Sequence, residues 1–282
     1  MLFCGGFDVV LQNVVRNVNQ VEGTDLKRVV KTLPSMLQGH FCSKAVCVKS
    51  DVYVFGGRNE NFKCITSVER YSRLANTWNK VGEMPDERVN YCVCAFTDKI
   101  FILGGFCGSV CYDNSTNSCL EFNTKDHAWK QVARMNEARS HAACAVFEGS
   151  LVIAGGWHSA YSTLNSVESY DVFDDKWSPM PNMIEEKHGH KLVVVRNKLF
   201  VIGRERQSCE VFDSNCKRFV IFKSPGECLF TMNNIFSIGN VIYTIKKYDN
   251  LVLCYNTETN DWTTGHHKLN IVDYSGVKIP WF

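Results

Sequence analysis

Short apolar runs alternate with turn residues along the whole chain, and four of these runs end at a pair of glycines. The pairs are Gly5-Gly6, Gly56-Gly57, Gly104-Gly105 and Gly155-Gly156, and a degenerate copy follows at Gly203-Arg204. The first residues of successive pairs are 51, 48, 51 and 48 residues apart. A nearly constant period of this length indicates one supersecondary unit that is repeated in series.

A tryptophan recurs at the same interval as the glycine pairs. Trp78, Trp129 and Trp177 are 51 and 48 residues apart, Trp262 takes the same position in the last copy, and Phe219 replaces it once. An aromatic residue precedes each of these positions by seven residues, and in several copies a glutamate lies two residues before that aromatic. The aromatic positions include Tyr71 and Tyr170, and the glutamates include Glu69, Glu168 and Glu210.

Each unit is predicted to contain four short β-strands. The apolar runs are rich in Val, Ile, Phe and Tyr, and no window shows the periodicity of a helix. Asn and Asp residues between the aromatic residue and the tryptophan favour a tight reversal of the chain. The second strand of each unit is expected near residues 2–4, 52–55, 100–103, 151–154, 199–202 and 241–245.

The repeated unit resembles the kelch repeat, in which a glycine pair is followed by Val-Glu-x-Tyr, a tryptophan and Met-Pro. The segment 67–71 leads to Trp78 and closes on Met84-Pro85, and the segment 166–170 leads to Trp177 and closes on Met180-Pro181. The resemblance covers essentially the whole chain and is strongest in the middle three units. It fades in the first, fifth and sixth units.

The six second strands and the resemblance together predict an all-β, six-bladed kelch β-propeller with four-stranded antiparallel blades. The propeller is expected to be a single domain over residues 1–282. Because the chain begins at a second strand, the segment 273–279 is expected to supply the missing strand. The ring would then be closed by the C-terminal strand pairing into the N-terminal blade, which leaves no long free sheet edge.

Composition narrows the classes of partner. The net charge is +2, from 31 basic and 29 acidic residues, and no basic stripe is present, so no nucleic acid is expected. No apolar run is long enough to span a membrane, and the N-terminus lacks the features of a signal peptide. Many of the 14 cysteines lie in predicted strands and none form Cys-x-x-Cys, which favours reduced thiols in a cytoplasmic protein over disulfides.

The residues that recur are expected to build the blades rather than to bind a partner. Paired glycines allow positive φ and close approach of the backbone, and large aromatic side chains fill the space between blades. The recurring glutamates are expected to pair with a recurring basic residue, which is Lys187 in one copy. The structural positions are Gly56, Gly57, Gly104, Gly105, Gly155, Gly156, Trp78, Trp129, Trp177, Trp262, Glu69, Glu168, Tyr71, Tyr170, Arg88 and Arg139.

The segments that do not repeat are expected to bind a partner. Loops after second strands and the starts of blades gather at one end of a propeller, and Arg, Trp and Tyr dominate partner binding. The basic and aromatic residues of these segments together favour a modestly basic pocket for an acidic or polar peptide. An ordinary solvated rim without a partner is the alternative. The predicted partner-binding residues are Arg58, Asn59, Asn90, Phe106, His141, Trp157, His158, Tyr161, His188, Arg204 and Arg206.

The resemblance to kelch-like proteins implies a protein-binding module, not an enzyme, that recognises substrates for a cullin-RING ubiquitin ligase. In that family a BTB domain and a BACK domain precede the propeller and hold the cullin. This chain contains neither, so it is expected to be a fragment of a longer product or a free kelch protein. Kelch proteins also resemble actin-binding proteins, which leaves a cytoskeletal function as an alternative.

A copper enzyme similar to galactose oxidase is a third hypothesis for this repeat. The candidate ligands are His188-Gly189-His190 and His266-His267, and no convergent third ligand is evident for either pair. The sequence also contains no nucleophile elbow and no phosphate-binding loop. Neither a metal nor another cofactor is therefore expected.

Overall fold

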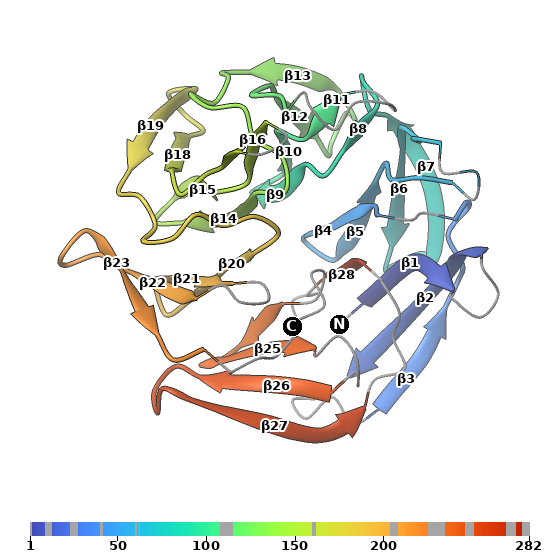
Figure 1. Ribbon diagram of the computed structural model, residues 1–282. Helices are drawn as coiled ribbons and strands as arrows, with labels where there is room; N and C mark the ends of the chain where they lie inside the picture. The colour runs from blue at the N-terminus through green and yellow to red at the C-terminus, as the bar shows by residue number, and fades with distance from the viewer. Residues whose placement is uncertain are drawn as a thin grey trace.

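The computed structural model describes residues 2–8, 13–22, 28–39, 42–59, 61, 63–107, 115–159, 162–203, 208–224, 235–245, 251–268 and 275–277. All regular elements in these ranges are β-strands. Figure 1 shows their sheets arranged like blades around a common centre, with the innermost strands next to the axis. Within these ranges there is no helix with the length and apolar character needed to cross a membrane.

Five four-stranded antiparallel sheets follow one another along the chain, and each begins with its innermost strand. These five sheets are the kelch blades of the structure. Their strands are β4 (Lys44–Val48), β5 (Asp51–Phe55), β6 (Ser67–Ser72) and β7 (Thr77–Glu83); β9 (Cys92–Phe96), β10 (Lys99–Leu103), β12 (Cys119–Asn123) and β13 (Trp129–Val132); β14 (Ala143–Phe147), β15 (Ser150–Ala154), β18 (Val167–Asp171) and β19 (Lys176–Met180); β20 (Lys191–Val195), β21 (Lys198–Ile202), β22 (Cys209–Asp213) and β23 (Arg218–Phe222); and β24 (Phe236–Ile238), β25 (Val241–Ile245), β26 (Leu251–Asn256) and β27 (Asp261–Lys268).

The predicted count of six blades is wrong, and the structure shows five blades of the kelch type. The remaining sheet combines both parts of the chain nearest its ends, in the order β28-β1-β2-β3. In it, β1 does not turn at Gly5-Gly6 but bulges there and continues to Asp8. Counting the apolar run at residues 2–4 as the second strand of a kelch blade therefore gave one blade too many, because the glycine pair after it lies inside a strand. The strands of this sheet are β1 (Leu2–Asp8), β2 (Asn13–Glu22), β3 (Arg28–Leu33) and β28 (Ser275–Val277).

The first and last strands of the chain do pair with each other. Leu2, Phe3 and Cys4 of β1 lie opposite Val277, Gly276 and Ser275 of β28 in an antiparallel register. The pairing covers one edge of β1, which otherwise would expose backbone donors and acceptors.

The core lies between neighbouring blades. In β10, Ile100 and Ile102 pack with Phe55 of the preceding blade, whereas Phe101 and Leu103 pack toward the following blade. Alternate side chains of a strand point to opposite faces, so a second strand that is covered on both faces must be apolar throughout. This explains the four-residue apolar runs that precede the glycine pairs.

Three of the repeated tryptophans connect their outer strand to the previous sheet. The indole Nε1 atoms of Trp78, Trp177 and Trp262 donate hydrogen bonds of 2.9, 2.9 and 2.7 Å to the carbonyl oxygens of Pro34, Ala133 and Lys223. Each of these carbonyls lies just after the outermost strand of the preceding sheet. The recurring Trp thus combines apolar packing with a directional contact.

Candidate functional site

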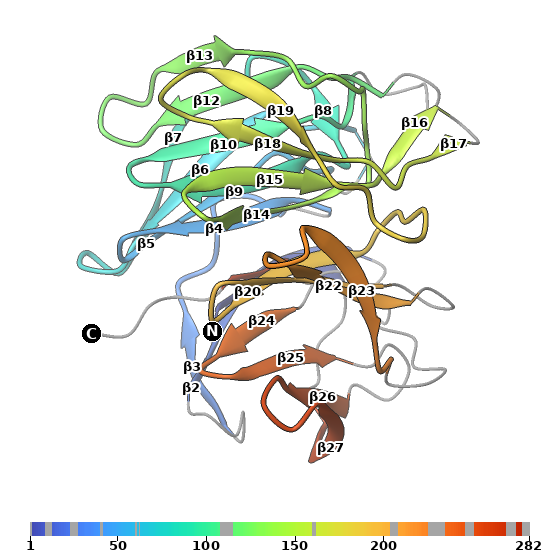
Figure 2. The same cartoon turned by 90° about the vertical axis from the view of Figure 1, so that its left-hand side faces the viewer.

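The starts of the blades and the loops after the glycine pairs lie at the same end of the sheets, which is called the rim below. Two small two-stranded sheets extend the blades at this end: β8 (Arg88–Val89) pairs with β11 (Phe106–Cys107), and β16 (Trp157–Ser159) forms a hairpin with β17 (Ser162–Thr163). Figure 2 shows β16 and β17 projecting beyond the blades. These two sheets carry Phe106 and Trp157, two of the aromatic residues that are predicted to bind a partner.

The glycine pairs let the backbone of one blade touch the start of the next. Gly104 has a φ of 64°, and a Cβ added there would lie 2.2 Å from the carbonyl oxygen of Arg139. The neighbouring Gly105 N–H donates to that same oxygen at 2.8 Å. The pair is therefore required at this position both for its conformation and for the close approach.

A chain of backbone hydrogen bonds joins three successive blade starts. The His141 N–H donates to the Asn90 carbonyl at 2.9 Å, and the Gly189 N–H donates to the His141 carbonyl at 2.7 Å. Asn90 and His141 have positive φ values of 54° and 51°, a region that non-glycine residues seldom occupy. This geometry aligns the blade starts and fixes the direction of their side chains.

Four ring side chains form a continuous series of edge-to-face and tilted contacts across this part of the rim. His141 lies against Phe106 at a centroid distance of 5.6 Å and against Trp157 at 4.4 Å, and Trp157 lies against His188 at 4.6 Å. Phe106 is buried, whereas His141, Trp157 and His188 are partly exposed. These four residues and Asn90 are called the rim cluster.

The rim cluster presents an apolar indole face between two imidazoles that can donate or accept hydrogen bonds. Such a surface can contact apolar and polar groups of a ligand at once, and the ring contacts and the hydrogen-bonded backbone beneath hold it in place. Rigid aromatic residues lose little conformational entropy on binding. The arrangement suits recognition of another molecule.

Three buried cations lie directly under the rim. Arg88, Arg139 and Lys187 are each 0% exposed. Arg139 contacts Glu168 at 2.6 Å, and Lys187 contacts Glu210 at 3.0 Å, as expected for the recurring glutamates. The buried charges are compensated, which is required for burial in a region of low dielectric constant.

The expected pairing with a recurring glutamate does not extend to Arg88, since Leu120 occupies the glutamate position in its blade. Arg88 instead contacts Asp86 at 2.6 Å and donates to the Gly104 carbonyl at 3.1 Å. Glu69 accepts hydrogen bonds from the backbone N–H groups of Leu37 and Gln38 at 2.8 and 3.2 Å. The blades therefore use the same buried position with different partners.

A second acidic position near these cations was missed in the sequence. Asp86, Glu137 and Glu185 each lie two residues before the buried cation, and they contact it at 2.6, 3.5 and 2.9 Å. The signal was available, since a methionine, an acid and a base recur with constant spacing. These three segments are Met84–Arg88, Met135–Arg139 and Met183–Lys187.

The family is shown by comparison with known proteins. The profile described as "KLHDC2/KLHL20/DRC7 Kelch-repeats domain" matches residues 8–204. The chain belongs to this kelch-repeats family. The kelch resemblance predicted from the glycine and tryptophan spacing is thereby confirmed.

Curated kelch proteins are similar to the chain at low identity. It is 25% identical to human Kelch-like protein 23 over 222 residues, which cover 75% of this chain and 38% of that protein. It is 27% identical to Kelch-like protein 40 of Xenopus tropicalis over 160 residues, which cover 55% and 25% of the two chains. It is 26% identical to Kelch-like protein 36 of Bos taurus over 221 residues, which cover 72% and 36%. The matched parts thus span only about a quarter to two fifths of these relatives.

A solved structure shares the fold. The structure of YjhT superimposes with a TM-score of 0.74 and covers 93% of this chain and 96% of that one, at 12% sequence identity. At this identity the likeness concerns the kelch fold alone.

The predicted partner-binding residues of this kelch chain fall into three groups. Asn90, Phe106, His141, Trp157 and His188 come together in the rim cluster. Among the residues outside this cluster, His158 is exposed on β16, and its Nδ1 lies 3.1 Å from the Ala138 carbonyl oxygen. Tyr161, Arg204 and Arg206 lie outside the described residues.

Arg58 and Asn59 belong to a different blade and form part of a tight loop after Gly57. Arg58 pairs with Cys64 through an isolated antiparallel bridge, and the Asn59 side chain accepts hydrogen bonds from the N–H groups of Asn61 and Lys63, each at 3.0 Å. Both residues thus lie in the loop after β5, in the blade that precedes the three blades of the rim cluster.

Metal ligands do not converge in the described part of the chain. No group of three or more His, Cys, Asp or Glu residues there has the arrangement of a metal site. His190 is 1% exposed, and burial, followed by the charges of Lys187 and Lys191, lowers its pKa to about 3. His190 is therefore a neutral core residue. The other pair of candidate copper ligands, His266 and His267, has side chains that the structure does not describe.

Proposed function

We propose that this chain is a protein-binding module that holds a protein or peptide partner at the rim cluster. The observation that carries the proposal is the series of ring contacts between Phe106, His141, Trp157 and His188, which come from three successive blades. The cores between blades are built mainly from residues of the four strands and from Met84, Met135 and Met183, whereas His141, Trp157 and His188 lie at the rim and stay partly exposed. Partly exposed aromatic residues on a rigid support are typical of binding hot spots.

The finer proposal is that the bound partner is a substrate of a cullin-RING ubiquitin ligase, and that the chain works in the cytoplasm. Membership of the kelch-repeats family and similarity to Kelch-like proteins 23, 36 and 40 support this proposal. In this role the rim would select the substrate, and attachment to the cullin would depend on a BTB domain in the same product or in an associated one. No catalytic step is assigned to the chain itself.

The test is affinity capture from a cell lysate, followed by mass spectrometry, with wild type and Trp157→Ala compared. We expect a discrete protein to be retained by wild type and lost in the variant, because truncation of a hot-spot tryptophan costs about 2 kcal/mol or more, which is roughly a 30-fold loss of affinity. Co-recovery of cullin and RING subunits with a BTB-containing form would support the ligase role.

Phe173→Ala is the matched control. Phe173 is 85% exposed in the turn between β18 and β19, and the antiparallel path of the blade places this turn at the end opposite the rim. Binding that is lost equally in both variants, or kept in both, would contradict the proposed site. Recovery of actin alone, equal in wild type and Trp157→Ala, would favour the cytoskeletal alternative.

The basic residues predicted from the sequence can be tested in the same assay. Arg204→Ala combined with Arg206→Ala is expected to weaken capture with little loss of stability if the partner is acidic. Unchanged capture would restrict the binding surface to the rim cluster.

A further inference from the structure

A cavity of about 160 Å³ lies at the centre of the ring, where the innermost strands meet. It is bordered by β4, β9, β14 and β20 and by the residue that precedes β24. The cavity is large enough for more than water, since each water in the liquid occupies roughly 30 Å³ and an engineered cavity of about 150 Å³ can hold benzene.

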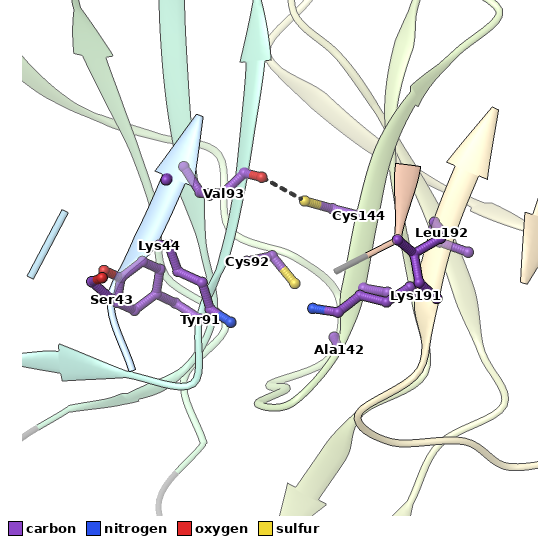
Figure 3. A pocket seen from close by; sticks show the side chains of 12 residues that line it. Ser43, Lys44, Tyr91, Cys92, Val93, Ala142, Cys144, Lys191 and Leu192 are labelled. Carbon is purple, nitrogen blue, oxygen red and sulfur yellow. Dashed lines mark hydrogen bonds between the residues drawn. The ribbon is translucent and has the colours of Figure 1, made fainter. Parts of the chain in front are cut away.

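Two lysines from opposite sides of the ring point into this cavity. Lys44 is the first residue of β4 and Lys191 is the first residue of β20. Figure 3 shows their side chains directed toward one another, with the Cys92 thiol beside both. The cavity lining contains no aspartate or glutamate, and no carboxylate of the described residues forms an ion pair with either lysine.

The thiols that line the cavity do not supply the missing negative charge. A contact with the Cys144 thiol, together with burial, raises the pKa of Cys92 well above its usual value. For Cys144 a contact with Cys92 lowers the pKa, but a contact with Cys94 and burial outweigh it and raise the pKa. Cys144 also donates to the Val93 carbonyl at 3.3 Å. Both thiols are therefore neutral at pH 7.

Apart from the lysines and the thiols, the polar side chains of the lining are the neutral hydroxyl groups of Ser43 and Tyr91. The Tyr91 hydroxyl already donates a hydrogen bond to the Phe55 carbonyl at 2.8 Å.

Burial and the nearby charge of Lys44 lower the pKa of Lys191 to about 7, although Cys92 and Cys144 act in the opposite direction. Two like charges that share a poorly solvated space repel one another. An anion between them would remove this repulsion.

We propose that the centre of the ring is an anion-binding site in which Lys44 and Lys191 together hold an inorganic oxyanion of the phosphate class. A dianion balances both ammonium groups, and its tetrahedral shape offers a separate oxygen to each. Ammonium groups bind phosphate oxygens as point charges, without the planar geometry that an arginine fork requires. The site is distinct from the rim cluster and does not depend on its function.

The experiment measures the thermal stability of the purified chain in inorganic phosphate and in sodium chloride at equal ionic strength, at pH 7. A ligand that binds only the folded state raises the Tm, and the rise depends on concentration in the way that mass action requires. We expect such a rise with phosphate in wild type. We expect the apparent affinity to fall at least tenfold in Lys44→Met and in Lys191→Met, whose side chains keep an apolar stem.

Lys198→Met is the matched control, because Lys198 is exposed and lies on the strand that pairs with β20. It is expected to respond to phosphate as wild type does. The proposal would be overturned if phosphate did not raise the Tm of wild type. It would also be overturned if Lys191→Met showed the same rise as wild type, or if acetate raised the Tm as phosphate does.

A measurement on the wild-type chain makes the test independent of the variants. Lysine side-chain NMR over a pH titration reports the pKa of Lys191 directly. Phosphate is expected to raise this pKa because the bound anion stabilises the ammonium form. A pKa of Lys191 that phosphate leaves unchanged would also overturn the proposal.

Discussion

Substitution of Gly104 by alanine tests the close approach between two blades. Gly104 has a positive φ, and an added Cβ would lie 2.2 Å from the Arg139 carbonyl oxygen. A left-handed conformation alone costs alanine about 1–2 kcal/mol. The overlap must in addition be relieved by moving backbone, which breaks the hydrogen bond from Gly105 and leaves buried groups unpaired, at about 1–3 kcal/mol. We therefore expect Gly104→Ala to lower the free energy of unfolding by about 2–5 kcal/mol.

Gly149→Ala separates the conformational cost of a positive φ from the cost of the steric overlap. Gly149 also has a positive φ, of 78°, but no heavy atom lies within 4 Å of its added Cβ. Its cost should therefore be the conformational part alone, about 1–2 kcal/mol. Urea unfolding followed by tryptophan fluorescence gives both values. Equal destabilisation by the two variants would refute the argument from close approach, and a wild-type melting curve for Gly104→Val would refute the second-strand assignment itself.

Two further predictions concern the blade contacts. Trp177→Phe should lower the free energy of unfolding in urea by about 1 kcal/mol more than Trp129→Phe does. The reason is that Trp177 Nε1 donates a hydrogen bond to the Ala133 carbonyl, whereas Trp129 Nε1 has no hydrogen-bond partner among the described residues. Equal losses in the two variants would contradict a role for the hydrogen bond. Hydrogen bonds from Lys187 and then Ser208 lower the pKa of Glu185 to about 2 from a usual value of 4.5. A carboxyl group whose pKa is lower in the folded state stabilises the fold at pH values above its unfolded pKa, and this stabilisation is lost as the pH falls through its folded pKa. Wild type should therefore lose stability between about pH 4.5 and 2 more steeply than Glu185→Gln. Parallel pH profiles of the two proteins would contradict this.

The repeated residues of this chain could be interpreted from sequence because each one solves the same local problem in every blade. The second strands predicted at 52–55, 100–103, 151–154, 199–202 and 241–245 are confirmed to within one residue at each end. They are apolar on both faces because two blades cover them, and a glycine pair follows wherever the next blade approaches the backbone. Spacing alone detects both requirements.

The blade count failed because the apolar run before Gly5-Gly6 was counted as the second strand of a kelch blade, although the glycine pair has another role there. Gly5-Gly6 lies within β1 at a bulge, so the pair there does not mark a chain reversal. Nothing in a dipeptide distinguishes a bulge from the end of a strand. The distinction depends on how β1 pairs with β2, where the register shifts between Cys4 and Gly6.

The rim cluster was predictable only in part. The sequence placed His141, Trp157 and His188 at one end of the fold, but it could not show that their rings are in contact, because they come from different blades whose starts meet only in the folded ring. Lys44 and Lys191 could not be recognised as a pair from the sequence, because each stands alone in its own strand. Their relation exists only once the ring brings β4 and β20 to a common centre.

The hydrogen bonds from Trp78, Trp177 and Trp262 to the preceding sheet also affect how the protein unfolds. Each bond joins the outermost strand of one blade to the chain that leaves the outermost strand of another, at the periphery where blades diverge most. The three bonds join the sheets in pairs, so opening one blade of a pair breaks a contact of the other, and the two are expected to lose structure together. Cooperative unfolding of this kind keeps partially opened states, with their exposed strand edges, sparsely populated during the life of the protein.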